Sequence, residues 1–306
     1  MSGGERRPSV GMIGLGIMGS AMSANLIRAG YQVIGYDVLA RRRQEHRQAG
    51  GQVARNGRDV GRRAGIVVSS LPSSEALLQT TAELAESGRP QQIVIETSTL
   101  PIAAKQEARR SLGARGTILL DCPLSGTGSQ ARVKDLIVYA SGDRGAYRRA
   151  VPVMEGFARA HYYVGAFGAG SKVKFVANLL VAVHNVAAAE ALVLAMKAGL
   201  DPAMVLKVIG DGAGSSRMLQ VRGPMMVKGD YSDAMMKLEI WQKDMTIIAD
   251  FAREVGCPTP LFAASGPIYT AALASGRHSE DTGAVCAVLE EMANNLRVLR
   301  KKSDHK

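Results

Sequence analysis

The chain has 306 residues, of which 46% are hydrophobic and 21% are charged, and its formal net charge at pH 7 is +11. This length allows two domains that each bury a core of their own, and the composition is that of an ordinary soluble globular protein. The basic residues form scattered doublets with no interleaved aromatic side chains, so we do not expect a nucleic-acid partner.

The ends of the chain and its cysteines bear on where the protein acts. Residues 1–8 lack the apolar core of a signal peptide and are predicted to form a short disordered arm, and residues 298–306 are predicted to form a basic tail. Cys122, Cys257 and Cys286 are far apart and lack metal-ligand spacing, which indicates neither a disulfide framework nor a metal site. A cytoplasmic location fits these features.

The most informative segment is 10–19, in which three glycines have the spacing of a dinucleotide-binding turn. A strand predicted over 10–13 turns sharply, and the free N–H groups and positive dipole end of the following helix favour a pyrophosphate. A plain structural turn is the alternative. The residues expected to bind the cofactor are Gly14, Leu15, Gly16, Ile17, Met18 and Gly19.

A second strand, predicted over 32–36, places Asp37 at its tip, where a carboxylate hydrogen-bonds the ribose hydroxyls of the cofactor. A carboxylate there repels a 2′-phosphate and favours NAD over NADP. Arg41, Arg42 and Arg43 follow and could hold such a phosphate, although a solvated first helical turn explains them as well. NAD is therefore the predicted cofactor, and NADP stays open.

The first half of the chain alternates short β-branched runs with helical stretches, which predicts a doubly wound, mainly parallel sheet. Further strands are predicted over 66–70, 93–97, 118–121 and 136–140. Beyond residue 170 only helical patterning follows, broken at Gly-rich and Pro-rich segments. The sequence thus predicts an α/β fold, with a Rossmann domain over 9–167 and an all-α domain over 168–297 built on a long interdomain helix.

The start of the second domain carries candidates for proton transfer. Hydride chemistry on an alcohol needs a proton acceptor beside the hydroxyl carbon. Lys174 and Asn178 are four residues apart, so a helix places both on one face with Cβ atoms about 6 Å apart. A desolvated lysine can act as the base in oxidation and as the acid in reduction. Lys172 is an equally good candidate on these grounds, and a solvated helix face explains all three residues.

The segment from 176 to 196 is apolar over about the length that a bilayer requires. Asn178, His184, Asn185 and Glu190 interrupt it, so we expect a helix buried between protein surfaces and no membrane. One small helical domain can hardly bury such a helix, which predicts a homodimer or homotetramer.

Four motifs, in the right order, resemble the β-hydroxyacid dehydrogenase family, which includes 3-hydroxyisobutyrate dehydrogenases and tartronate semialdehyde reductases. They are the segments Gly14–Leu26, Asp121–Gly126 and Gly168–Asn178, and the pair Lys243-Asp244. The resemblance runs from about Val10 to Met292. It implies a nicotinamide-dependent oxidoreductase with a Rossmann domain like that of 6-phosphogluconate dehydrogenase.

The resemblance implies roles for particular residues around the substrate. It makes Lys174 the catalytic lysine and Asn178 its partner in holding the substrate. It also makes Ser125, Gly126 and Thr127 the residues that bind the substrate, whose carboxylate would meet Ser125 and the N–H of Gly126. Backbone N–H groups in a glycine-containing turn form an anion-binding concavity, whereas a hydroxyl that caps its own turn is the alternative for Ser125.

On the cofactor side, the resemblance places Leu71, Pro72, Ser98 and Thr99 beside the nicotinamide, at the carboxyl ends of two predicted strands. Ordinary loop chemistry explains these residues as well. Lys243 belongs to the pair that helps to close the site over cofactor and substrate. Trp241 either packs over the nicotinamide or fills a protein interface, and the sequence leaves both open.

Two positions depart from the family's pattern. Thr127 stands where a second glycine is usual, and Ala177 replaces a usual asparagine just before Asn178. Both changes bear on the identity of the substrate more than on the reaction. The segments 179–184, 229–231 and 279–284 are most similar to the branch of the family that acts on four-carbon sugar acids such as threonate.

The sequence therefore predicts an NAD(P)-dependent β-hydroxyacid dehydrogenase that transfers hydride between the nicotinamide and the β-carbon of a small carboxylic acid, with Lys174 as general acid and base. Two alternatives are a non-catalytic dinucleotide-binding interaction module, which the +11 charge favours, and an imine reductase of the same fold. Relatives of both kinds lack a lysine at this position, so Lys174 argues against them.

Overall fold

The computed structural model describes residues 8–87 and 89–295. Of these, the residues up to Phe175 form one compact unit, here the sheet unit, and those from Val176 form a second, the helical unit. The predicted N-terminal arm, apart from Pro8, and the predicted basic tail lie outside the described residues.

Six parallel strands form the main sheet, in the order β3-β2-β1-β4-β5-β6. In chain order they are β1 (Val10–Ile13), β2 (Val33–Tyr36), β3 (Gln52–Val53), β4 (Ile66–Ser69), β5 (Ile93–Glu96) and β6 (Ile118–Asp121). Strands β1 and β5 are fully buried, as strands covered by helices on both faces must be. The strand order reverses between β1 and β4, which is where Rossmann sheets bind their ligands. The predicted doubly wound sheet is confirmed.

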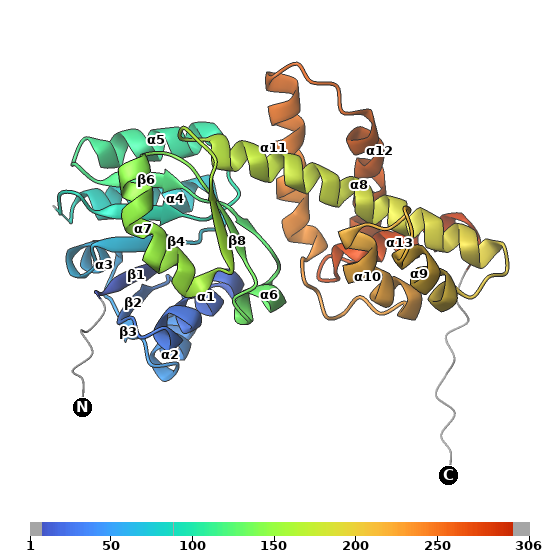
Figure 1. Cartoon of the computed structure of the whole chain (residues 1–306), viewed down its shortest axis with the longest axis horizontal. Coiled ribbons are helices and arrows are strands. Elements are labelled where there is room, and N and C mark those ends of the chain that lie inside the picture. The colour runs from blue at the N-terminus through green and yellow to red at the C-terminus, as the bar shows by residue number, and fades with distance from the viewer. Residues whose placement is uncertain (1–7, 88, 296–306) are drawn as a thin grey trace, which may run out of the picture. The chain divides into compact units, whose positions relative to one another are not determined.

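Helices cover both faces of this sheet (Figure 1). The core on one face joins Met12 of β1 to α1 (Ile17–Arg28) and α7 (Arg144–Phe157). The core on the other face joins Ile13 to helices α3 (Gly57–Arg63), α4 (Ser74–Ala85) and α5 (Ile102–Gly113). Adjacent residues of a strand point to opposite faces, so this one strand anchors both cores. Helix α2 (Ala40–Gln48) follows β2 in the chain.

A smaller sheet of three strands follows β6 and consists of β7 (Leu124–Ser125), β8 (Ile137–Ala140) and β9 (Ala160–Tyr163). Strand β7 pairs antiparallel with β8, and β9 pairs parallel with β8. Helix α6 (Gly128–Arg132) connects β7 to β8. Strands β3, β7 and β9 were not predicted, because two of them have only two residues and β9 carries only exposed or half-buried side chains.

The described part of the helical unit, residues 176–295, contains helices and no strand. Its elements are α8 (Ala169–Lys197, which begins in the sheet unit), α9 (Pro202–Gly210), α10 (Arg217–Lys228), α11 (Leu238–Glu254), α12 (Pro260–Ala274), η1 (Thr282–Ala284) and α13 (Val285–Met292). Helices α8, α9, α10 and α11 end at or just before the predicted Gly-rich and Pro-rich breaks. The predicted all-α domain built on a long helix is confirmed.

Helix α8 is long and apolar enough to span a membrane by these two criteria alone. Within the helical unit, however, Ala182, Asn185 and Ala189 are fully buried. The hydroxyl of Tyr269 in α12 also donates a hydrogen bond to the Ala182 carbonyl at 3.0 Å. A polar side chain and a cross-helix bond inside this packing make α8 a core helix of the helical unit.

Candidate active site

The turn between β1 and α1 is built by its backbone. Gly14 has φ +86°, and its N–H donates to the Tyr36 carbonyl at 2.9 Å, which joins the ends of β1 and β2. A Cβ atom at Gly19 would collide with the Gly14 carbonyl oxygen, so glycine alone allows this close approach of helix and strand. Gly16 caps α1 without a side-chain hydrogen bond. The first N–H groups of the helix are thus presented as a binding site for an anion such as a pyrophosphate.

Asp37 follows β2 directly and is 5% exposed. One carboxylate oxygen, Oδ2, accepts a hydrogen bond from the Leu15 N–H at 2.8 Å, and the other accepts one from the Leu39 N–H at 2.9 Å. These bonds bring the acidic residue against the glycine turn, although 22 residues separate Asp37 from Leu15. The arrangement fits the carboxylate that holds an adenosine ribose in Rossmann folds.

The three arginines after Asp37 lie in different environments. Arg42 lies 3.3 Å from Asp37 Oδ2, and a Cβ atom at Gly16 would lie 3.6 Å from its guanidinium. Arg43 donates to the Val38 carbonyl at 3.0 Å, whereas Arg41 is largely exposed and pairs with Glu45. Of the three, Arg42 therefore lies at both the turn and the acidic residue.

The loops after β4 and β5 meet at the carboxyl edge of the sheet. The Leu71 N–H donates to the Ser98 hydroxyl at 2.8 Å. A Cβ atom at Gly14 would meet the Ser70 carbonyl oxygen and lie 3.5 Å from the Leu71 side chain. The structure thus places Leu71 beside the glycine turn and joins it to the loop that contains Thr99. Pro72, the next residue, is exposed.

The segment after β6 turns at Gly126, where φ is +134° and an added Cβ atom would lie 2.6 Å from Leu136. Ser125 precedes this turn and is half-buried. Thr127 caps α6: its hydroxyl accepts from the Gln130 N–H, and its own N–H donates to Gln130 Oε1 at 3.0 Å. The hydroxyl that caps α6 is therefore that of Thr127, whereas the alternative considered from the sequence had given the Ser125 hydroxyl a capping role.

The start of α8 is tied to the end of β6. Ser171 donates two hydrogen bonds to Asp121, from its N–H and from its hydroxyl, each 2.8 Å long. Lys172 is exposed, whereas Lys174 is half-buried. This difference separates the two lysines that the sequence pattern could not distinguish.

Asn178 lies one helical turn beyond Lys174 and is 4% exposed. Its side-chain amide donates to Asp244 Oδ2 of α11 at 2.9 Å. Lys243 Nζ lies 3.4 Å from Oδ1 of the same carboxylate. Asp244 thus joins Asn178 of α8 to Lys243 of α11 within the helical unit.

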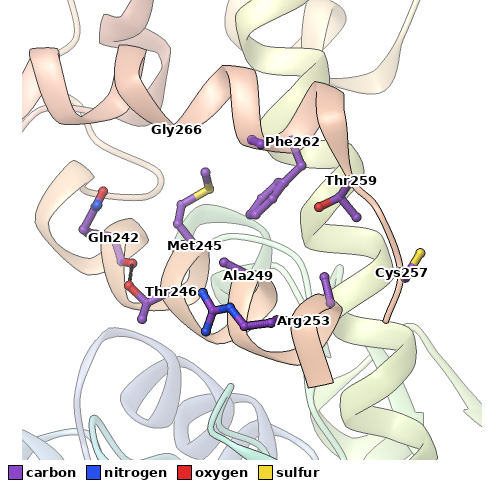
Figure 2. Close-up of a pocket in the computed structure, with 11 residues that line it drawn as sticks. Gln242, Met245, Thr246, Ala249, Arg253, Cys257, Thr259, Phe262 and Gly266 are labelled. Atoms are coloured by element: carbon purple, nitrogen blue, oxygen red, sulfur yellow. Dashed lines mark hydrogen bonds between the residues drawn. The ribbon is translucent and has the colours of Figure 1, made fainter. Parts of the chain in front are cut away.

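A cavity of about 400 Å³ lies between α11 and α12 (Figure 2). Met245 and Phe262 line it, and the hydroxyl of Thr246 is bonded to the carbonyl of Gln242 in its own helix. Arg253 at its edge pairs with Asp250. None of the predicted site residues lines this cavity, so it is separate from the candidate active site. Among the described residues, no group of three or more His, Cys, Asp or Glu side chains could hold a metal ion.

Comparison with known proteins agrees with this geometry. Residues 9–165 match the NAD-binding domain of 6-phosphogluconate dehydrogenase, and residues 168–289 match the NAD-binding domain of NADP-dependent 3-hydroxyisobutyrate dehydrogenase. An L-threonate dehydrogenase from Cupriavidus necator is 34% identical over 92% of this chain and 95% of its own. The chain belongs to the β-hydroxyacid dehydrogenase family.

Solved structures show the same relationship for this dehydrogenase. A 3-hydroxyisobutyrate dehydrogenase from Salmonella typhimurium is 31% identical with a TM-score of 0.83, over 92% of this chain and all of that one. The corresponding enzyme from Mycobacterium tuberculosis is 29% identical with a TM-score of 0.85, over 92% of this chain and 99% of that one. The protein is therefore an NAD(P)-dependent oxidoreductase of this family.

The sequence-based reasoning missed a buried group of charges in this dehydrogenase. Lys105 of α5 is 0% exposed, and its Nζ lies 2.6 Å from Glu96 Oε2 and 2.8 Å from Asp121 Oδ1. Burial lowers the pKa of Lys105, but the two carboxylates outweigh this effect and raise it above its ordinary value. Burial likewise raises the pKa of Asp121, but Lys105 and Ser171 more than compensate and lower it. A signal was present, because Lys105 shares the buried face of α5 with Ala108 and Leu112.

Proposed function

We propose that this dehydrogenase oxidises the β-hydroxyl of a small hydroxylated carboxylic acid, with Lys174 exchanging the hydroxyl proton. The proposal is carried by the position of Lys174 on α8: half-buried, three residues after the anchored Ser171 and one turn before Asn178. Bound NAD(P) would accept the hydride. Lys174 would take the proton as a neutral amine in oxidation and return it as an ammonium in reduction.

The residues proposed to hold the substrate come from two segments. Ser125 and the Gly126 N–H would bind the carboxylate, because a turn with positive φ presents N–H groups to an anion. Asn178 would bind the hydroxyl that reacts, with its amide oriented by the bond to Asp244. Thr127 would act mainly through the shape of the loop, since its hydroxyl is occupied in the cap of α6.

For the substrate, we propose a four-carbon sugar acid such as threonate. The support is the 34% identity to an enzyme named L-threonate dehydrogenase, together with the resemblance of segments 179–184, 229–231 and 279–284 to that branch of the family. For the cofactor, we propose a preference for NAD, since the buried Asp37 carboxylate would repel the 2′-phosphate of NADP. Leu71, Pro72, Thr99 and Lys243 would complete the cofactor site.

We further propose that the active protein is a homodimer or homotetramer in the cytoplasm. On α8, Val176 and Leu194 are 59% and 71% exposed, and a second copy of the chain would cover such apolar side chains. The exposed thiol of Cys257 fits a reducing compartment. Light scattering after size-exclusion chromatography would measure the mass, and a stable monomer would contradict the assembly.

Wild type, Lys174→Ala and Lys172→Ala should be assayed with NAD and NADP on threonate, glycerate, 3-hydroxyisobutyrate and a β-hydroxy amino acid. We expect Lys174→Ala to lower kcat by about 10² to 10⁴, the usual contribution of general acid–base catalysis, while NAD still binds. Lys172→Ala, the matched control, should stay within about twofold of wild type because its exposed ammonium lies two residues away.

Two results would contradict the proposal. Equal losses in the two lysine variants would show that Lys174 has no special part in proton transfer. Tight dinucleotide binding by wild type without turnover of any acid would favour an imine reductase or a non-catalytic binding module. In the second case, binding to DNA with a steep dependence on salt would identify the module, because phosphate contacts release counterions.

A further inference from the structure

The most unusual side chain of the sheet unit is Lys105, a lysine with no exposed surface. Its ammonium contacts three oxygens: Glu96 Oε2 at 2.6 Å, Asp121 Oδ1 at 2.8 Å and the Ser98 carbonyl at 2.7 Å. Two carboxyl groups thus share one buried ammonium. Glu96 and Asp121 end the neighbouring strands β5 and β6, so the cluster lies at the edge where Rossmann sheets bind ligands.

On one side, the cluster leads to the loops proposed to bind the cofactor. The Ser98 N–H donates to Glu96 Oε1 at 2.8 Å, and the Ser98 carbonyl accepts a hydrogen bond from Lys105 Nζ. Its hydroxyl accepts the Leu71 N–H at 2.8 Å. Since Leu71 and Thr99 are proposed cofactor residues, Lys105 fixes both loops through this one serine.

On the other side, the cluster leads to the helix that carries Lys174. Asp121 Oδ1 accepts bonds from both Lys105 and the Ser171 hydroxyl, and Oδ2 accepts the Ser171 N–H at 2.8 Å. Ser141 adds a bond to Oδ2 at 3.1 Å and accepts one from the Gly170 N–H at 2.9 Å. The first turn of α8 is therefore positioned by a carboxylate that Lys105 in turn holds.

A continuous series of hydrogen bonds thus runs from Leu71 through Ser98, Lys105 and Asp121 to Ser171. Buried ion pairs stabilise a fold little better than apolar side chains of the same size. We propose that Lys105 is a positioning residue, which sets the loops beside the nicotinamide and Lys174 at the distance and orientation that hydride and proton transfer require. This inference rests on the proposed function.

The two arms of the network allow a test that a purely structural role would fail. Ser98→Ala removes the acceptor of the Leu71 N–H, so it should raise the KM for the dinucleotide about three- to tenfold and leave kcat within about twofold. Ser171→Ala removes one bond to Asp121, so it should lower kcat about tenfold with the dinucleotide KM unchanged. Lys105→Met should do both, and Lys105→Arg, which keeps the charge, should recover part of kcat.

Gln92→Met is the matched control. Gln92 is 1% exposed, lies just before β5 and donates two hydrogen bonds to carbonyls, those of Gly61 and Ala64. It is at the amino end of the strand that Glu96 ends, so its loss should lower Tm without separating kcat from KM. If Lys105→Met does not fold, the two serine variants decide, because both keep all three charges of the cluster.

Two failures are distinguishable. Suppose that wild type turns over a hydroxy acid, but that in each serine variant kcat falls and the dinucleotide KM rises together as Tm falls, as expected for Gln92→Met. The positioning role of Lys105 is then overturned. If wild type turns over nothing, the proposed function fails instead. Dinucleotide dissociation constants still test the Ser98 arm in that case: an unchanged affinity in Ser98→Ala overturns it, and a weaker one supports it.

Discussion

Buried charge serves different purposes in the two units. In the sheet unit, Lys105 and two carboxylates join the ends of β5 and β6 to the loop at Ser98 and to the start of α8. In the helical unit, Arg222 Nε donates to Asp281 Oδ1 at 2.8 Å, and Asp281 Oδ2 accepts the N–H groups of Met235 and Met236 at 2.8 and 3.0 Å. Those two residues precede α11, in a stretch of chain that has no helix.

The comparison shows how a buried carboxylate can replace secondary structure. Backbone N–H groups must find acceptors when they are withdrawn from water. In the helical unit, Asp281 supplies those acceptors to the irregular stretch, and Arg222 balances its charge. In the sheet unit, Asp121 instead accepts hydrogen bonds from Ser171 in the first turn of α8 and from Lys105. We therefore expect the Arg222–Asp281 pair to act on stability and the cluster around Lys105 to act on the reaction.

The largest expected effect is that of Arg222→Met, which leaves Asp281 buried without its cation. The free energy of unfolding of the helical unit should fall by about 3 to 5 kcal/mol. Trp241 is the only tryptophan of the chain and is 2% exposed, with its ring centroid 6.1 Å from that of Tyr269. Its fluorescence in a urea titration therefore reports the unfolding of the helical unit. The double variant with Asp281→Asn should lose less than Arg222→Met. If Arg222→Met kept the wild-type unfolding midpoint but raised the KM for the cofactor, the Arg222–Asp281 pair would act on the reaction and not on stability.

The parts of the fold that local spacing determines could be predicted from the sequence. The turn at Gly14 to Gly19 depends on which residues lack a Cβ atom, and the position of Asp37 depends on where β2 ends. Both are local properties. The long helix α8 was recognisable for the same reason, since its length and apolar character need no information about its neighbours.

What depends on contacts distant in the chain could not be predicted. The sequence places Lys105 on the apolar face of a helix, which indicates burial. It does not show the partners of Lys105, because Asp121 is 16 residues away and Ser171 is 50 residues beyond Asp121. Trp241 was left open between a cofactor contact and a packing role, and it lies in the core of the helical unit against Tyr269. Asp244 was noted only as a neighbour of Lys243, and its bond to Asn178 spans 66 residues.

The second effect concerns Arg42 of the sheet unit, which lies beside Asp37 and the glycine turn. Arg42→Ala should lower kcat/KM with NADP by about 10- to 100-fold, because a hydrogen bond to a charged group contributes about 1.5 to 3 kcal/mol. With NAD the change should stay within about threefold. Arg41→Ala is the control, since Arg41 is exposed and pairs with Glu45. Equal losses with both cofactors would mean that Arg42 acts on the turn and not on the 2′-phosphate.

A third, smaller effect separates loop stability from charge in the sheet unit. Thr127→Ala removes the cap of α6 and should lower the free energy of unfolding by about 1 kcal/mol. Thr127→Gly introduces the residue that is usual in the family. It should lower the free energy of unfolding by only a few tenths of 1 kcal/mol and extend the range of acids accepted. Thermal unfolding and the substrate panel measure the two effects. An unchanged Tm in Thr127→Ala would show that the cap contributes nothing.

The smallest expected effect is a dependence of stability on pH that is confined to the sheet unit. His46 is 5% exposed, with Nδ1 3.1 Å from the Ser23 hydroxyl and Nε2 3.1 Å from the Gln52 carbonyl. Burial lowers the pKa of His46 below its ordinary value of 6.5, so the unfolded chain binds more protons than the folded one just below that pH. The contribution of His46 to stability is complete above pH 6.5 and is lost as the pH falls through that value toward the folded pKa.

Hydrogen exchange of the β1 and β2 amides should therefore accelerate as the pH falls from about 7 to 5, after correction for intrinsic exchange, by more in wild type than in His46→Gln. The urea midpoint reported by Trp241 should not share the difference between the two proteins, because His46 lies in the other unit. If that midpoint shifts together with β2 exchange, the two units unfold as one, and the contrast between their buried charges cannot be one of separate stabilities.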